Sequence, residues 1–515
     1  MTQTRCDSNA PRITGSHPAR GSVARAVAAV LAIGVIGMPA AMAQSSGSQD
    51  QQTAPGGQGQ AGATSPAIQA GPVTLDFGGF TELATIWRNR TEFADVGSVS
   101  YGSLPFPTAS NYYVSEFRES ARQSRFSLLA KGEHFLGLTP EAYFEMDFLG
   151  AAPTANSRES NSYNPRMRVF YADFLTDGGL YFLAGQSWSL ATLYKQGLQA
   201  RNEDVPLTID AQYVSGFNWT RNPQVRIVQE FSKTFSLGLS LESPQTVVNA
   251  SNTVPSALAS SAYPAGLLYS TTPSSAGGLL DNATSYTYDI APDVVLKAAL
   301  DPGWGHYELY GLGRWFRTAI PGASASENTV TGGGIGGGAI LPLIPHVLSV
   351  QVSGLYGKGI GRYSSSQLAD VTLQPNGDFS PIKEYDVLLG LMYNPVPQLQ
   401  IYGYFGRDKA SADYFDATIT AAGVVDGPYA YGYGNPLYNN SGCYTLGGKC
   451  QGNVAQSDEV SAGVWWKYYE GRLGNLQLGL QLAYNQDDLF NGVGGSPRTG
   501  VSEGMVSFRY YPYQH

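Results

Sequence analysis

Charged residues, cysteines and long apolar runs are all scarce in this chain of 515 residues. Only 14% of the residues are charged, and the chain has three cysteines and a formal net charge of −9. Three cysteines are too few for a disulfide scaffold, and an acidic balance excludes a protein that binds nucleic acid nonspecifically. A single apolar run, residues 23–43, approaches the roughly 18 residues that a membrane-spanning helix requires. The sequence therefore predicts no helical membrane domain beyond that run.

The first 72 residues are expected to lie outside the folded domain. Four arginines precede an apolar core at 26–37, and the small-residue motif Ala41-Met42-Ala43 follows it. This order is typical of an export signal that is cleaved after Ala43, and it disfavours an uncleaved membrane anchor. Residues 44–72 are mostly Gln, Gly, Ser, Ala and Pro, so they bury too little apolar surface to offset the entropy of ordering. We expect 1–43 to be a signal peptide and 44–72 a disordered periplasmic extension.

From residue 73 onward, apolar side chains recur at every second position within short segments bounded by Gly, Pro, Asn and Asp. Between residues 476 and 484, four leucines and Tyr484 alternate with Gln and small residues. Between residues 141 and 148, apolar residues alternate with a face that carries Glu145 and Asp147. Successive side chains of a strand point to opposite faces, so each segment predicts a strand with one apolar and one polar face.

The lengths of the connections decide between a soluble sandwich and a membrane barrel. Very short turns, such as 176–179 and 394–397, alternate with long polar loops at 89–121, 245–289 and 410–458. Short turns at one end and long loops at the other are typical of an outer-membrane barrel, in which every backbone group is paired within the lipid. We therefore expect an all-β fold, a transmembrane antiparallel β-barrel formed by residues 73–515.

Sixteen segments fit this pattern. Bacterial single-chain barrels have even numbers of strands, so a seventeenth candidate at 212–220 is assigned to the end of the third long loop. The expected strands are 73–88, 122–134, 139–150, 166–175, 179–189, 223–232, 235–243, 288–300, 305–318, 329–343, 346–362, 382–394, 398–409, 458–470, 475–488 and 503–513.

Four motifs between residues 120 and 232 carry a resemblance to a known family. They are Arg122-Gln-Ser-Arg-Phe126, Gly185-Gln-Ser-Trp-Ser189, Val205-Pro-Leu-Thr-Ile-Asp-Ala-Gln-Tyr213 and Trp219-Thr-Arg-Asn-Pro-Gln-Val-Arg226. The motifs resemble those of trimeric porins of the DcaP-like and phosphate-selective type. The resemblance implies a sixteen-stranded barrel, a homotrimer in the lipid of the bacterial outer membrane, and a third loop folded into the lumen as a constriction. It also implies a water-filled channel for passive diffusion of small hydrophilic solutes.

A pore selects solutes by its width and by the charges at its narrowest part. The alternation places basic and acidic side chains on the lumen-facing side, and opposed walls of charge would set up a field across the lumen. Each of these charges is also compatible with a structural role in an ion pair. The basic candidates are Arg125, Lys131, Arg226, Lys297, Arg314, Lys467 and Arg509, and the acidic candidates are Glu145, Asp147, Glu230, Glu308, Glu384, Asp386 and Glu459.

Arg118, Arg122 and Arg125 concentrate positive charge just before and into the second strand. Together with the resemblance to an anion-preferring family, this cluster suggests a preference for small carboxylated or phosphorylated solutes. The net charge acts in the opposite direction, and so do three acidic residues on the third loop, Glu203, Asp204 and Asp210. The choice between anion and cation selectivity stays open at this point.

Cys443 and Cys450 are the only cysteines beyond the expected signal peptide. Exported proteins occupy an oxidising space, so we expect a disulfide that closes a loop tip. A zinc site would need further ligands at suitable spacing, and the histidines show no such spacing. No metal or other cofactor is expected.

Three features admit other functions. The glycines at 332–337 match the spacing of a nucleotide-binding loop, but they lie in an expected strand that no helix follows. Carboxylates spaced like Glu145 and Asp147 also occur in glycosidase clefts, so a secreted β-rich carbohydrate-active enzyme is the main alternative to a porin. The loops at 245–289 and 410–458 would also suit a barrel-type surface receptor or adhesin. We expect a porin rather than an enzyme.

Overall fold

The computed structural model describes residues 67–92, 101–150, 164–270, 286–322, 326–421 and 424–513. The expected signal peptide at 1–43 and most of the expected extension at 44–72 lie outside these ranges. None of the helices within them is both long and apolar enough to cross a membrane. The described helices are three short 3-10 helices, η1 (Ser110–Tyr113), η2 (Ser256–Ser261) and η4 (Gly361–Tyr363).

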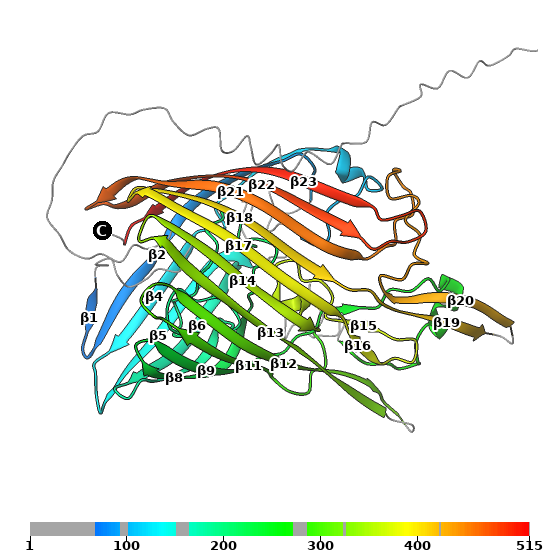
Figure 1. The fold of residues 1–515 in the computed structure, drawn as a ribbon, viewed down its shortest axis with the longest axis horizontal. Coiled ribbons are helices and arrows are strands. Elements are labelled where there is room, and N and C mark those ends of the chain that lie inside the picture. The colour runs from blue at the N-terminus through cyan, green and yellow to red at the C-terminus, as the bar shows by residue number, and fades with distance from the viewer. Residues whose placement is uncertain are drawn as a thin grey trace, which may run out of the picture. The chain divides into compact units, whose positions relative to one another are not determined.

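Sixteen antiparallel strands close into a β-barrel. Figure 1 shows the curved sheet that they form. Each strand pairs with the next along the chain, and the first pairs with the last. All sixteen expected segments are confirmed as barrel strands, and 212–220 is confirmed as loop. The strands are β2 (Val73–Arg88), β4 (Arg125–Gly132), β5 (Leu138–Gly150), β6 (Asn164–Thr176), β7 (Leu180–Trp188), β8 (Arg221–Ser232), β9 (Phe235–Glu242), β11 (Asp293–Leu300), β12 (His306–Ile320), β13 (Ser326–Ile344), β14 (Leu348–Lys358), β17 (Lys383–Val396), β18 (Leu399–Ala410), β21 (Val454–Gly471), β22 (Gly474–Leu489) and β23 (Arg498–Tyr511).

The alternation of side chains places the apolar face outside and the polar face inside. On β22, Leu480 and Leu482 are more than half exposed, whereas Gln477 and Gln481 are buried toward the lumen. A soluble protein would bury those leucines, because apolar surface is transferred out of water during folding. The inverted arrangement is that of a barrel whose outer face meets lipid.

The amino-terminal boundary of the folded part differs from the sequence expectation. Residues 68–70, which the sequence assigns to the disordered extension, form strand β1 (Ile68–Ala70) and pair with the start of β2. Gly71 makes the tight turn between the two strands with φ of +63°, a conformation that glycine adopts without steric cost. At least three residues of the expected extension, 68–70, are therefore part of the folded structure.

The two ends of the barrel carry different connections. Short turns such as those between β17 and β18 or between β21 and β22 lie at the end where β2 begins and β23 ends (Figure 1). The opposite end carries the long loops, which contain most of the remaining elements. These are β3 (Glu116–Ser120), which pairs with β2, a sheet of β10 (Val248–Asn249), β15 (Val371–Leu373) and β16 (Phe379–Pro381), and a hairpin of β19 (Asp413–Ala421) and β20 (Val424–Tyr433).

The glycines at 332–337 lie within β13, as the sequence indicated. They make room for large side chains on the lumen side of the wall. A Cβ atom at Gly332 would lie 2.6 Å from the Phe316 ring, and one at Gly336 would overlap the Tyr310 ring. One position further on, a Cβ atom at Gly338 would lie 2.7 Å from Leu193 of the third loop. The run is therefore a packing feature of the wall.

Candidate functional site

Three loops from the long-loop end enter the barrel and narrow its lumen. They are the third loop (189–220, between β7 and β8), the loop 359–382 between β14 and β17, and the segment 101–106 between β2 and β3. Most of their side chains are buried, including Ile209 and Phe217 of the third loop. The inward-folded third loop that the family resemblance implied is confirmed, and the other two loops were not anticipated.

The third loop crosses from one wall of the barrel to the other. Near its start, Lys297 of β11 donates to the Thr192 carbonyl at 2.7 Å. In its middle, the Leu207 amide donates to the Tyr404 hydroxyl of β18 at 3.1 Å, and the Trp465 indole of β21 donates to the Leu207 carbonyl at 2.8 Å. Strands β11 and β21 are well separated around the sheet, so these bonds place the loop across the lumen.

The far part of the third loop is bound by a wall rich in buried acids. Gln481 of β22 donates to the Asp210 carboxylate at 3.1 Å, and the Ser215 amide donates to Glu459 of β21 at 3.2 Å. Burial raises the pKa of the Asp210 carboxyl well above its usual value, which favours its protonated form. The buried carboxylates of this acidic wall are Glu384, Asp386, Asp408, Glu459, Asp487 and Glu503.

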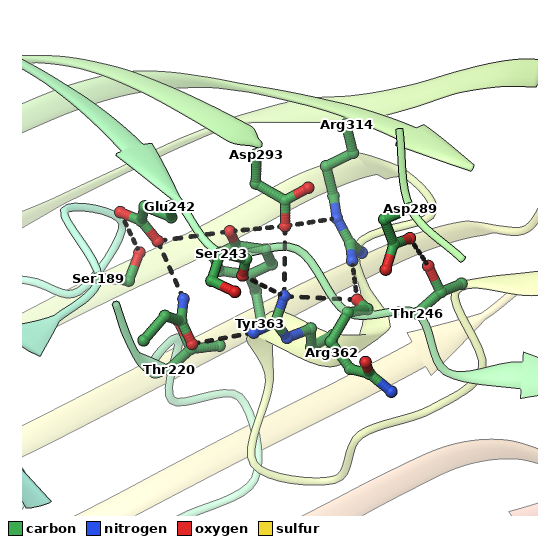
Figure 2. Close-up of polar contacts among 12 residues, drawn as sticks. Ser189, Thr220, Glu242, Ser243, Thr246, Asp289, Asp293, Arg314, Arg362 and Tyr363 are labelled. Carbon is green, nitrogen blue, oxygen red and sulfur yellow. Dashed lines mark hydrogen bonds and ion pairs between the residues drawn. The ribbon is translucent and has the colours of Figure 1, made fainter. Parts of the chain in front are cut away.

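The loop 359–382 is anchored by a buried network around Asp293 (Figure 2). Arg314 of β12 forms an ion pair with Asp293 of β11 at 3.1 Å and one with Asp370 of the loop at 2.5 Å. From the loop side, Arg362 approaches Asp293 at 3.4 Å, and the Tyr363 hydroxyl donates to it at 3.1 Å. The predicted pore residue Arg314 therefore fastens a loop to the wall.

The three loops also contact one another. The Tyr101 hydroxyl of the first segment donates to the Tyr213 carbonyl of the third loop at 2.9 Å. The Trp219 amide of the third loop donates to the Tyr363 carbonyl at 2.8 Å, and the Ser365 hydroxyl donates to the Gln212 carbonyl at 2.9 Å. The constriction is therefore a single assembly of three loops.

A cluster of four arginines, Arg125, Arg166, Arg168 and Arg221, surrounds the acidic pair Glu145 and Asp147 of β5. Arg168 contacts Glu145 at 2.5 Å and Asp147 at 3.0 Å, and Arg166 contacts Asp147 at 2.7 Å. The guanidinium carbon of Arg221 lies 5.1 Å from the Trp188 ring centroid and 5.2 Å from that of Trp219. We call these four residues the arginine cluster; it has two more positive charges than the acidic pair has negative ones.

The positive charge of the arginine cluster acts on the tip of the third loop. Burial raises the pKa of the Tyr213 phenol, but the charges of Arg168, Arg221 and Arg125 together bring it below its usual value. Two nitrogens of the cluster, Arg125 Nε and Arg221 Nη1, are buried without a hydrogen-bond partner in the described part of the chain. The cluster therefore presents unsatisfied donors beside the constriction.

The structure distributes the other predicted pore residues along the barrel. Near the short turns, Lys131 pairs with Glu141 at 3.1 Å and Glu230 accepts from Gln199 at 2.6 Å. At mid-height, Lys297 pairs with Glu308 at 2.6 Å and Arg226 donates to the Tyr194 hydroxyl at 2.5 Å. Near the long loops, Arg118 pairs with Glu116 at 2.7 Å and Arg122 donates to Ser120 at 3.2 Å. Glu203 and Asp204 are buried on the third loop. A direct role of each in solute selection stays a prediction.

Sequence reasoning missed Arg166, Arg168 and Arg221. Strict alternation along β6 would place Arg168 on the same face as Phe170, which is exposed toward lipid. The pairing of β5 with β6 shifts by one residue here, since Glu145 faces Val169 and Met146 faces Met167. This β-bulge turns Arg168 into the barrel, where it is 1% exposed. In the sequence, the inward position of Arg168 could have been inferred from its pairing with Arg166 opposite the two inward carboxylates Glu145 and Asp147.

The expected disulfide is present. Cys443 and Cys450 are bonded and close a loop tip beyond β20. The Thr108 hydroxyl donates to the Gly448 carbonyl at 2.5 Å, and the Gly447 amide donates to the Thr108 carbonyl at 2.9 Å. The disulfide therefore fixes a segment that covers the first long loop.

The fold is similar to that of known outer-membrane channels. The structure of the outer membrane channel DcaP of Acinetobacter baumannii has a TM-score of 0.56 and 14% sequence identity over 85% of this chain and 97% of that one. OmpT, an outer membrane protein of Vibrio cholerae, has a TM-score of 0.44 and 10% identity over 87% and 99% of the two chains. An anion-selective porin from Comamonas acidovorans has a TM-score of 0.43 and 9% identity over 85% and 99%.

No family model matches the chain, and no curated protein matches it. The resemblance to DcaP-like porins is confirmed at the level of the fold, which is all that 14% identity supports.

Proposed function

We propose that the chain is an outer-membrane channel for passive diffusion of small hydrophilic solutes, and that its constriction favours small anions such as carboxylates. The apolar outer face and the polar inner face of the barrel support the channel. The observation that carries the anion preference is the arginine cluster, in which four guanidinium groups face two carboxylates. Arg125 Nε and Arg221 Nη1 are left without acceptors among the described residues.

The carboxylate of a passing solute would supply hydrogen-bond acceptors for these arginine nitrogens. A buried donor without a partner costs about 1–3 kcal/mol, and a guanidinium binds the two oxygens of a carboxylate through parallel N–H groups. Water reaches the cluster, because the Arg166 side chain is 36% exposed. A hydrated anion can therefore contact the cluster at Arg166, whereas Arg125 Nε and Arg221 Nη1 lie buried behind it.

The acidic wall lies on the other side of the constriction, on β17 to β23. Opposed charges of this kind produce a field across the lumen that orients dipolar solutes and disfavours apolar ones. The acids are engaged with the third loop, as in the bond from Asn218 to Asp386 at 2.9 Å. Oxygens of the acidic wall, such as both of Glu384, are also unpaired among the described residues, but they repel an anion. An anionic solute is therefore expected to contact the arginine cluster.

Reversal potentials of single channels in a salt gradient test the proposal. The wild-type protein in planar bilayers is expected to pass chloride in preference to potassium. Arg125→Gln and Arg221→Gln should each move the permeability ratio toward unity. Arg407→Gln is the matched control, because Arg407 faces outward and pairs with Asp458 at 2.8 Å. It removes one charge from the protein without altering the lumen.

The anion preference would be contradicted if the wild type were cation-selective and neither arginine substitution changed its selectivity. This outcome would not contradict the proposal that the protein is a channel. Liposomes that contain the protein but exclude small sugars would contradict the channel itself.

The same proposal includes the cellular setting of the protein. We propose export through a signal peptide at 1–43, residence in the bacterial outer membrane, and a homotrimer. The outward-facing leucines of β22 support contact with lipid. Crosslinking of the protein in native membranes tests the trimer, and amino-terminal sequencing of the mature chain tests cleavage after Ala43.

The depth to which the loops fill the lumen favours a second candidate, a surface receptor or adhesin with a narrow or closed barrel. Tyr101, Phe217 and Tyr363 from the three loops are all nearly inaccessible to solvent. Liposome swelling separates the candidates, since a receptor of this kind would admit neither sugars nor amino acids.

The contacts of Glu145 and Asp147 favour a structural role over a catalytic pair. Both carboxylates are bound by arginines, so neither is placed as a free acid beside an open cleft. A glycosidase needs one carboxyl group that is protonated when substrate binds. Their arrangement therefore supports a lumen lining.

A further inference from the structure

The outward face of strand β17 changes from apolar to polar between its two ends. On β17, Tyr393 lies near the short-turn end and Lys383 lies ten residues away at the strand's other end. Ten residues span about 33 Å along a strand, which a tilt of about 40° reduces to about 25 Å of height. That height equals the apolar band of an outer-membrane barrel, so Lys383 lies at the headgroup level of the leaflet on the long-loop side.

Three lysines gather at this level on adjacent strands. Lys358 of β14 and Lys383 of β17 lie directly opposite each other in the sheet. Lys409 of β18 lies opposite Tyr385, two residues further along β17. All three are exposed on the outer face, where the Lys383 ammonium lies 5.3 Å from the Tyr356 ring centroid. We call Lys358, Lys383 and Lys409 the lysine patch.

The lysines of the patch are not paired with carboxylates of the described residues, although Asp458 lies diagonally across the sheet from Lys409. Neighbouring outward cations are paired, Arg407 with Asp458 at 2.8 Å and Arg498 with Asp488 at 3.1 Å. No ion pair of the described part of the chain includes a lysine of the patch. Like charges directly opposite in a sheet are destabilising, so Lys358 and Lys383 need an anion from outside the chain.

The patch is confined to one side of the barrel. At the same end of β8, β9 and β11, the outward residues are Val225, Leu241 and Val294, which lie side by side in the sheet. A general attraction to the membrane surface would not require the cations to be gathered on neighbouring strands. Their grouping indicates one bound anionic group.

We propose that the lysine patch binds the phosphate groups of a glycolipid in the outer leaflet, the phosphorylated lipid A portion of lipopolysaccharide. The proposal rests on the proposed function, because it requires the long-loop end to face outward from the cell. Below the patch, Tyr356, Leu389 and Phe405 form an apolar surface on the same strands. Acyl chains would lie along this surface while the phosphates meet the ammonium groups.

Lipid binding to the full, processed protein in mild detergent tests the proposal. Wild type, the double variant Lys358→Gln/Lys383→Gln and the matched control Lys233→Gln/Arg472→Gln are mixed with lipid A that carries both phosphates. Lys233 and Arg472 are exposed cations in short turns at the opposite end. Bound lipid is counted by native mass spectrometry. We expect the control to bind like wild type and the patch variant to bind about 30-fold more weakly, at about 1 kcal/mol per lysine.

Each other outcome overturns a part of the proposal. Equal binding by the patch variant removes the lysines from the site. Equal binding of lipid A without phosphates shows that the phosphates are not recognised. Equal competition by phosphatidylglycerol shows that any anionic lipid suffices and overturns the glycolipid assignment. Conductance in phosphatidylcholine bilayers tests the channel function separately from the lipid A site. The patch variant should conduct like wild type whether or not it binds lipid A.

Discussion

Gly406 of β18 lies directly against the backbone of Ser215 at the tip of the third loop. A Cβ atom at position 406 would overlap the Ser215 carbonyl oxygen. The next loop residue, Gly216, passes the wall at Val387 with φ of +80°, a conformation that favours glycine. The loop tip and the wall therefore fit together only while position 406 carries no side chain.

Gly406→Ala is expected to push the tip of the third loop off the wall. A loop that no longer docks leaves more of the lumen to water, so single-channel conductance should rise. Gly403→Ala on the same strand is the control, because the nearest atom to its added Cβ would lie 3.9 Å away. Equal conductance of the two variants would show that the tip does not limit the flow of ions.

Asp147→Asn is expected to change selectivity in the direction opposite to Arg221→Gln. The carboxylate offsets the charges of Arg166 and Arg168, so its loss leaves the arginine cluster more positive. The ratio of anion to cation permeability in a salt gradient should therefore increase. A decrease, or no change while the variant still folds, would show that the field of this cluster does not reach the path of the ions.

The fold was predictable from the sequence because the alternation of single strands is a local property. Leu480 and Gln481 reveal the two faces of β22 without knowledge of any neighbour. The constriction was less predictable, because its contacts join distant segments, such as Arg314 and Asp370, which are 56 positions apart in the sequence. Arg168 was missed for a different reason: a single bulge reverses the face on which it lies, and sequence alternation does not reveal a bulge.

Lys297→Met is expected to destabilise the protein by about 3 kcal/mol, because it removes the nearer of the two basic partners of the buried Glu308 carboxylate and leaves only His306, at 3.0 Å. The two side chains are almost inaccessible to solvent and lie 2.6 Å apart. Urea unfolding in detergent micelles measures the loss. The double variant Lys297→Met/Glu308→Gln should recover part of it, since no uncompensated charge remains. Equal stability of the single variant and wild type would contradict a structural role for this pair.

Reduction of the disulfide is expected to loosen one loop and leave the barrel intact. A bond between Cys443 and Cys450 that closes so short a loop contributes about 2–3 kcal/mol to local order. Lys449 lies exposed within the closed loop and is a site for trypsin. Cleavage after Lys449 should accelerate in reducing buffer, whereas cleavage after the turn residue Lys233 should not. Equal acceleration at both sites would indicate global rather than local loosening.

Asp204→Asn is expected to stabilise the protein at pH 7 and to have little effect near pH 4. Burial raises the pKa of Asp204 on the third loop to about 6, and its Oδ2 has no hydrogen-bond partner in the described structure. The folded state therefore holds a proton that the unfolded chain releases above its ordinary pKa of about 4. Stability that is present below pH 4 is lost as the pH rises to 6, at a cost of about 3 kcal/mol.

Above pH 6 that cost is complete, and asparagine avoids it because it carries no charge. Urea unfolding of wild type and Asp204→Asn across pH 4 to 8 should give curves that meet at low pH and separate by pH 6. Asp378→Asn is a suitable control, since Asp378 lies outside the third loop and accepts from Asn376 at an exposed turn. The opposite outcome is that the free energies of unfolding of wild type and Asp204→Asn run parallel from pH 4 to 8. That result would show that Asp204 does not take up a proton when the third loop docks in the barrel.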